Sequence, residues 1–194
     1  MTTEERAIAY IRELFAENAG GHDAAHTLRV YRNAMRIADR EPACDREIVA
    51  LAALLHDVDD HKLFATEDNA NARAFLEENH VPADRQEQIL AAVNAVSFTQ
   101  NRDRRPETRE GQIVRDADRL DAMGAIGIAR TFAYGGEHGR PIEESIAHFH
   151  EKLLLLKDTL DTEAAKRMVE DRHAFLLAFL EEYERESGEA HDAI

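Results

Sequence analysis

Apolar residues recur at the spacing of an α-helix along almost the whole chain, and this pattern constrains the fold more than any other feature. No stretch alternates apolar and polar residues for long enough to predict a β-strand. Glycines and prolines such as Gly20, Pro42 and Pro82 interrupt the pattern where helices are expected to end or begin. The sequence therefore predicts an all-α fold, with helices near residues 3–18, 23–40, 45–60, 67–79, 83–97, 110–122, 125–134, 142–158 and 162–185.

Two of these helices have contrasting apolar surfaces. The run IVALAALL at residues 48–55 is apolar on every side, which predicts a central helix covered all round. The last helix has a single stripe and should pack against the outside of the bundle; the stripe consists of Met168, Phe175, Leu176, Phe179 and Tyr183. Asp23 and Asp45 precede their helices as N-cap residues do.

Length and the absence of linkers favour a single domain. The 194 residues contain no internal repeat and no low-complexity segment. We expect one helical domain over residues 1–186, with a core at about 21–140 and C-terminal helices at 142–185 packed on it. Residues 187–194 have no apolar stripe and are expected to form a frayed tail.

Charge and cysteine content exclude several classes of partner. With 24 basic and 39 acidic residues, the net charge of −15 argues against binding to duplex nucleic acid or to a membrane surface. The N-terminal segment is acidic and amphipathic rather than signal-like, and no apolar run approaches the length of about 20 residues that spans a membrane. Cys44 is the only cysteine, as is common in reducing compartments. These features predict a cytoplasmic protein.

Four polar residues stand where apolar ones are expected. His26 lies on the apolar stripe of its helix, His56 and Asp57 directly follow the buried run, and Asp118 lies within the apolar face of helix 110–122. One such histidine is usually a hydrogen-bonded core residue, and one such carboxylate is usually a cap or half of an ion pair. Two of each on three helices are explained together by a bound divalent cation, which would neutralise the carboxylates and coordinate the imidazoles.

The order of these residues resembles the H…HD…D signature of the HD-domain metal-dependent phosphohydrolases. The flanking strings HTLRV, LAALLHD and DADRLDAMGAIGIAR resemble a subgroup of small bacterial single-domain members, and the resemblance runs from about Gly21 to Arg140. It implies an all-helical bundle with one divalent metal held by His26, His56, Asp57 and Asp118. Such a nitrogen and oxygen set suits Mn, Fe, Co, Ni or Zn, with Mg also possible, and we favour Mn.

Two residues after the HD pair are candidates for catalysis. Asp60 is four residues after His56 and would share its face if the helix continued for one turn. In the related guanosine-tetraphosphate hydrolases, a carboxylate at this offset is implicated in handling the attacking water. Lys62 resembles a lysine found shortly after the HD pair in several family members, where it would meet a phosphate. The alternative for both is a solvated side chain near a helix end.

Further polar residues surround these candidates. Asp121 is one turn beyond Asp118 and would orient a ligand or Arg119, and Arg29 would brace the site. His22 is interpreted as a helix-start residue rather than as a ligand. The segment at residues 99–109 holds four arginines against two acidic residues, which is typical either of a loop over a phosphate pocket or of an ordinary solvated loop.

The resemblance implies a metal-dependent phosphohydrolase that uses metal-activated water on a small phosphorylated metabolite, most simply a nucleotide. The most similar-looking family members suggest pyrophosphate release from nucleoside triphosphates, whereas others cleave nucleoside monophosphates or cyclic phosphodiesters. One alternative is a non-catalytic helical module that binds a metal or a nucleotide. Another is a di-iron oxygenase, which needs further histidines before the last aspartate.

The histidine count favours one metal ion. The interval 58–117 contains only His61 and His80. His61 is expected to point away from the face of His56, and His80 precedes Val81 and Pro82 at a helix end. A homo-oligomer is possible through the leucine run 153–156, which is apolar on all sides of its predicted helix.

Overall fold

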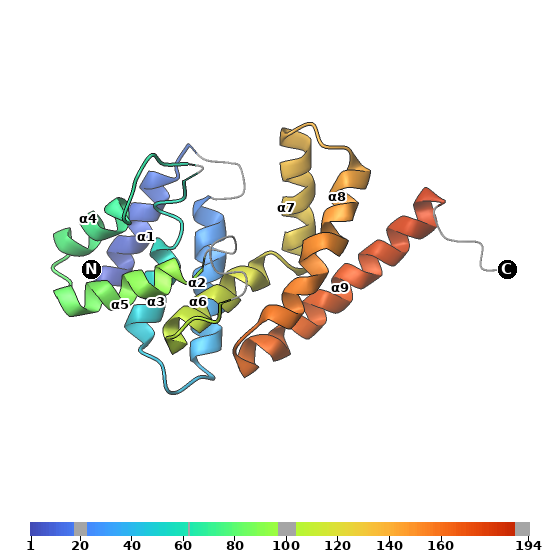
Figure 1. Ribbon diagram of the computed structural model, residues 1–194. Coiled ribbons are helices and arrows are strands. Elements are labelled where there is room, and N and C mark those ends of the chain that lie inside the picture. The colour runs from blue at the N-terminus through green and yellow to red at the C-terminus, as the bar shows by residue number, and fades with distance from the viewer. Residues whose placement is uncertain (18–22, 62, 97–103, 189–194) are drawn as a thin grey trace.

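The protein folds as a set of packed helices (Figure 1). The computed structural model describes residues 1–17, 23–61, 63–96 and 104–188, and no β-strand occurs among them. The predicted all-α class is therefore confirmed for this part of the chain. The helices are α1 (Thr3–Leu14), α2 (Ala24–Ala38), α3 (Arg46–Leu55), α4 (Ala70–Glu78), α5 (Ala83–Asn94), α6 (Arg109–Asp121), α7 (Gly124–Glu137), α8 (Ile142–His148) and α9 (Glu163–Ser187).

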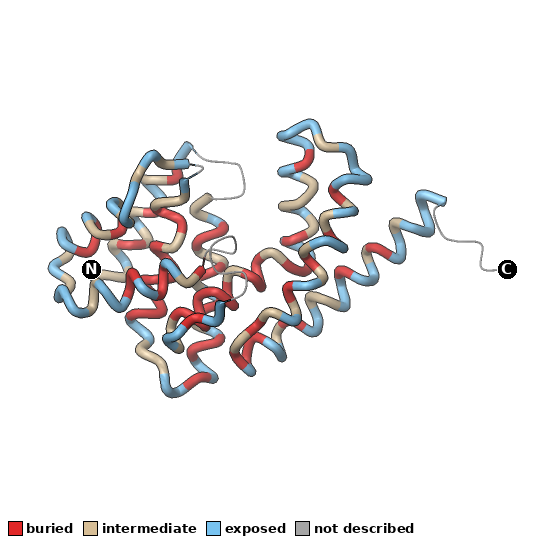
Figure 2. Tube along the Cα trace, viewed as in Figure 1, coloured by how far each residue is buried: buried red, intermediate tan, exposed pale blue. Residues whose placement is uncertain are grey.

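Helix α3 is the centre of the N-terminal part, as its composition predicts. Every residue from Ile48 to Leu55 is buried, and α3 packs against α1, α2, α5 and α6 (Figure 2). Asp23 caps α2 by accepting a 2.6 Å hydrogen bond from the backbone N–H of His26, and Asp45 caps α3 in the same way through Glu47. Both predicted N-caps are confirmed, and they fix where the two helices that lead to the site begin and how they enter the bundle.

Helix α6 joins the N-terminal helices to a second group, in which α7 packs against α8 and against the long α9 (Figure 1). The junction is polar and buried. Arg115 binds the carboxylate of Asp161, and the fully buried Asp116 accepts hydrogen bonds from the backbone N–H and the hydroxyl of Thr162 at 2.7 and 2.8 Å. The guanidinium of Arg119 donates to the backbone carbonyl of Thr159. One face of α6 therefore anchors the start of α9.

The two largest differences from the predicted helices lie at 45–60 and 142–158. The helix expected at 45–60 ends at Leu55, and His56 to Asp59 form turns. A physical reason is that Asp57, Asp59 and Asp60 would place three negative charges at the negative end of the helix dipole. The helix expected at 142–158 divides into α8, a π-helical turn (Phe149–Leu153) and a 3₁₀ segment (Leu154–Thr159).

The apolar surfaces of the C-terminal segments also differ from the prediction. Within the leucine run, Leu153 and Leu156 are buried whereas Leu155 is 51% exposed. In α9, Leu176 is buried as expected, but Phe175 is 53% exposed and does not belong to the packed stripe. None of the helices in the described ranges has the length and apolar character needed to cross a membrane.

Candidate metal centre

Three helices bring the four predicted ligands together. His26 lies in the first turn of α2, His56 and Asp57 follow the end of α3, and Asp118 lies in the last turn of α6. The Nε2 atoms of His26 and His56 are 3.3 Å apart, and each lies 3.3 Å from Oδ2 of Asp57. Oδ1 of Asp118 is 3.5 Å from Nε2 of His26. Ligand atoms of His26, His56 and Asp118 all lie within 4.8 Å of one another, and Oδ2 of Asp57 lies beside the two histidines.

The other nitrogen of each imidazole is already engaged. Nδ1 of His56 lies 2.9 Å from the backbone carbonyl of Ala53, which can only accept, so Nδ1 carries the proton. Nδ1 of His26 lies 2.8 Å from Oδ2 of Asp121, a carboxylate that is held by arginines and likewise accepts. These assignments follow from the partners and leave both Nε2 lone pairs directed into the cluster. The geometry is that of metal-ligating histidines whose second nitrogen is fixed by a carbonyl or a carboxylate.

The donor set fits a divalent metal ion. Two ligand atoms that are each about 2.1 Å from one ion lie about 3.0 Å apart at a right angle and about 3.4 Å apart at the tetrahedral angle. The separations from Nε2 of His26 to the ligand atoms of His56, Asp57 and Asp118, 3.3 to 3.5 Å, are close to these values. The side chains of His26 and His56 are almost fully buried and that of Asp57 is nearly so, whereas the side chain of Asp118 is 33% exposed. The cluster is therefore open on the side of Asp118.

The electrostatics of the cluster also favour a cation. Burial lowers the pKa of His56, but the charges of Asp57 and Asp118 and the hydrogen bond to Asp57 outweigh it and raise this pKa to about 9. The pKa of His26 is raised as well: burial lowers it, and Asp121 and Asp57 more than compensate. Two carboxylates thus act on two buried imidazoles, and a positive charge at their centre is stabilised.

Asp121 connects the cluster to two arginines. Its Oδ1 accepts a 2.7 Å hydrogen bond from Nε of Arg29, and its Oδ2 accepts from Nη2 of Arg29 at 3.1 Å and from Nη1 of Arg130 at 2.8 Å. Burial alone would raise the pKa of Asp121, but the hydrogen bonds from His26 and Arg29 and the charges of His26 and Arg130 hold it well below its usual range. Asp121 thus orients His26, one of the two roles expected for it, and Arg29 braces Asp121 rather than a ligand.

The turn that carries the HD pair is fixed by α4. Asp59 accepts hydrogen bonds from the backbone N–H groups of Asn71 and Ala72, at 2.9 and 3.0 Å, and so caps the first turn of α4. The side chain of Asn71 donates to the carbonyl of Val58 at 2.7 Å. These contacts hold the chain immediately after Asp57. The position of the Asp57 carboxylate is therefore fixed by a turn rather than by a helix.

The remaining predicted candidates have separate outcomes. Because α3 ends at Leu55, the premise that placed Asp60 on the helical face of His56 is wrong. Lys62 and His22 lie outside the described residues. His61 and His80 are both exposed, and His80 has a positive φ of 55° at the end of α4, in agreement with the predicted helix end.

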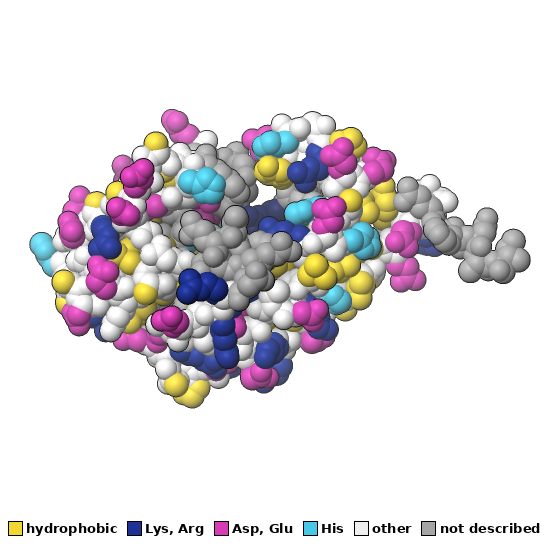
Figure 3. All heavy atoms as spheres, viewed as in Figure 1, with side chains coloured by type: hydrophobic (Ala, Val, Ile, Leu, Met, Phe, Trp, Pro, Cys, Tyr) yellow, Lys and Arg dark blue, Asp and Glu magenta, His cyan; other side chains and the backbone are white. Residues whose placement is uncertain are grey.

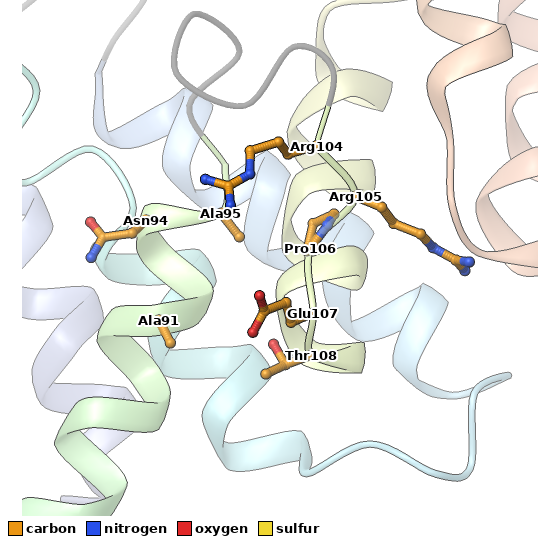
Figure 4. A pocket seen from close by; sticks show the side chains of 8 residues that line it. All are labelled: Ala91, Asn94, Ala95, Arg104, Arg105, Pro106, Glu107 and Thr108. Atoms are coloured by element: carbon orange, nitrogen blue, oxygen red, sulfur yellow. The ribbon is translucent and has the colours of Figure 1, made fainter.

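The arginine-rich segment is described only from Arg104 onward. Here Arg105 lies 3.2 Å from the carboxylate of Asp161, and Arg109 pairs with Glu41, so two of the four arginines hold the fold together. A cavity of about 240 Å³ lies between the end of α5 and this segment (Figure 4). It is lined by Ala91, Asn94, Ala95, Arg104, Arg105, Pro106, Glu107 and Thr108, none of which belongs to the metal cluster.

Replacing Asp121 with alanine is expected to lower the affinity for Mn²⁺ about 10- to 100-fold, because His26 loses the acceptor that orients its ring. Arg29 and Arg130 each have 26% of the side chain exposed, so water can solvate them and the fold should persist. Titration calorimetry with Mn²⁺ measures the affinity, and circular dichroism checks the fold. An unchanged affinity in folded protein would show that Asp121 does not support the cluster.

Comparison with known proteins agrees with the geometry. The family model described as HD domain matches residues 23–123, a range that includes all four candidate ligands. The chain is 35% identical over 196 residues to the uncharacterized protein YpgQ of Bacillus subtilis (strain 168), covering 94% of this chain and 92% of YpgQ.

Solved structures show the same fold. The crystal structure of Bacillus subtilis YpgQ in complex with ADP superposes with a TM-score of 0.81 at 34% identity, covering 94% of this chain and 97% of that one. An HD-superfamily hydrolase from Bacillus thuringiensis superposes with a TM-score of 0.78 at 38% identity, covering 96% of this chain and 99% of that one. On the sequence match, the shared fold and the order of His26, His56, Asp57 and Asp118, this chain belongs to the HD-domain family.

Proposed function

We propose that the protein is a metal-dependent phosphohydrolase that uses a single divalent ion, with Mn²⁺ favoured, to cleave a small phosphorylated metabolite. The observation that carries the proposal is the convergence of two imidazole Nε2 atoms and two carboxylates, from His26, His56, Asp57 and Asp118, within a fold shared with HD-superfamily hydrolases. A divalent ion held by these residues supplies Lewis acidity, which lowers the pKa of bound water and polarises a phosphoryl oxygen.

Residues of the chain orient the ligands and leave one side of the cluster open to substrate. Asp121 and the carbonyl of Ala53 hold the two imidazoles so that Nε2 faces inward. The partly exposed side chain of Asp118 marks the side on which we propose that substrate and water have access. In the reaction, an oxygen of water forms a bond to phosphorus while the phosphorus–oxygen bond to the leaving group breaks.

A nucleotide is the substrate class that we propose. Support comes from YpgQ, a relative that covers nearly all of this chain and whose crystal structure is a complex with ADP. The net charge of −15 requires that an anionic substrate be received at a locally positive place, and the metal cluster with its adjacent arginines provides one.

The test is a panel of nucleoside mono-, di- and triphosphates and cyclic nucleotides with Mn²⁺, in which released phosphate and pyrophosphate are measured separately. We expect one nucleotide class to be hydrolysed, and we expect EDTA to stop the reaction. Full metal occupancy with no turnover of any phosphorylated compound would contradict the proposal and favour a non-catalytic binding module.

We also propose that Asp60 acts on the attacking water and that Lys62 binds a substrate phosphate, as the family resemblance implies. Asp60 also lies close to Asp57 in the folded chain, because its backbone N–H donates to the carbonyl of Asp57 at 3.1 Å within the turn.

The variant Asp60→Ala is expected to retain its metal and to lose most turnover, roughly 10²-fold or more, as does an enzyme that lacks a group for proton transfer. Metal content by elemental analysis and kcat with the best nucleotide of the panel give the two readouts. Asp39→Ala, which removes an exposed carboxylate beyond the end of α2, is the control. Unchanged turnover would reduce Asp60 to a solvated residue of the turn.

A further inference from the structure

Helix α7 brings a positive charge to the metal cluster from outside the N-terminal helices. Its Arg130 donates a 2.8 Å hydrogen bond to Oδ2 of Asp121, the same oxygen that accepts from Nδ1 of His26. Arg29, one turn after His26 on α2, binds the same carboxylate. A single buried carboxylate is therefore shared by two guanidinium groups beside the cluster.

Both arginine side chains are partly exposed. The side chains of Arg29 and Arg130 are each 26% exposed, although Asp121 between them is only 2% exposed. Arg29 uses Nε and Nη2 for Asp121, so its Nη1 lies on the other edge of the planar group. Lys and Arg side chains lie at the floor of the hollow that separates α7 from the N-terminal helices (Figure 3).

The opposite face of α7 explains why Arg130 points toward the cluster. Phe132 packs against Phe149 and Phe179, with ring centroids 5.9 and 5.8 Å apart. A side chain at Gly135 would meet the hydroxyl of Ser145. At 100° per residue, positions 132 and 135 lie far around the helix from Arg130, so α8 and α9 cover one face and Arg130 belongs to the other.

We propose that Arg29 and Arg130 form an anion-binding pair that receives a phosphate group of the substrate beside the metal cluster. This inference rests on the proposed function and assigns a role to α7, which lies outside the matched range of residues 23–123. Guanidinium groups held in place by a carboxylate bind phosphate oxygens in fixed geometry and keep their charge at every physiological pH.

Arg130 offers the cleaner test, because Arg29 and His26 still hold Asp121 when Arg130 is removed. Arg130→Gln is expected to bind Mn²⁺ as tightly as the wild type, within about twofold, and to bind both ADP and inorganic pyrophosphate at least about tenfold more weakly, which corresponds to one lost charge-assisted hydrogen bond. Titration calorimetry gives the affinity for the metal alone and then, with Mn²⁺ present, the affinity for each anion.

The matched control is Arg85→Gln. Arg85 is 28% exposed and pairs with Asp45 and Glu47, so its loss removes the same charge at similar exposure far from the cluster in the fold. This variant should bind both anions like the wild type.

Two results would overturn the inference. One is binding of both anions by Arg130→Gln at wild-type strength. The other is loss of the metal in parallel with the anions, which would mean that Arg130 acts only through Asp121 and His26. Failure of the proposed function can be distinguished from failure of this inference. If the wild type binds both anions through Arg130 but hydrolyses no phosphorylated compound, the anion-binding role of the arginine pair is supported and the assignment as a phosphohydrolase is wrong.

Discussion

Replacement of Asp57 by alanine is expected to remove both the bound divalent metal and the hydrolytic activity. Asp57 supplies the oxygen that lies 3.3 Å from both imidazole Nε2 atoms, so its loss leaves two histidines and the partly exposed Asp118 around an undersupplied ion. The affinity for the metal should fall by more than the roughly 100-fold that follows the loss of a residue outside the ligand set. Elemental analysis after gel filtration gives the metal content, and release of phosphate or pyrophosphate gives the activity.

The same experiment carries its own control. Asp39→Ala removes a carboxylate that is 60% exposed and pairs with Arg46 on the surface, and it should keep wild-type metal content and turnover. If folded Asp57→Ala retained full metal occupancy, the assignment of Asp57 as a ligand would be wrong.

Asp116→Ala is expected to have a large effect on stability and no direct effect on the metal. The carboxylate of Asp116 accepts from the backbone N–H of Asp161 at 3.0 Å and from two donors of Thr162, all at the start of α9. Because alanine leaves these buried donors without an acceptor, we expect a loss of about 2–4 kcal/mol in the free energy of unfolding. Urea denaturation followed by circular dichroism measures this loss.

At a temperature where Asp116→Ala is still folded, its affinity for Mn²⁺ should equal that of the wild type. A change of less than about 0.5 kcal/mol in stability, the size expected for a surface substitution, would contradict the anchoring role of α6.

The sequence predicted most of what lies within regular helices. The buried run of α3 and the N-caps Asp23 and Asp45 follow from local patterns, and the structure has all of them. The end of α3 at Leu55 was missed because no glycine or proline marks it, although the cluster of aspartates that follows was an available signal. The break in the helix at 142–158 left no signal, since the buried Phe149, Leu153, Leu156 and Leu160 keep the spacing of an α-helix.

The candidate site, too, could be predicted only in part from the sequence. Spacing and family resemblance indicated His26, His56, Asp57 and Asp118 as candidate ligands, and the structure places their side chains together. Contacts between distant elements could not be predicted, because nothing in the local sequence relates Arg130 of α7 to Asp121.

A crystal of the protein grown with Mn²⁺ and measured at a wavelength where manganese scatters anomalously tests the central claim most directly. We predict one anomalous peak for each chain, within bonding distance of Nε2 of His26, Nε2 of His56 and the carboxylates of Asp57 and Asp118. Two peaks at the cluster would contradict the single-ion account and revive the di-iron type of oxygen chemistry. A peak elsewhere, with these four side chains left without metal, would contradict the site itself.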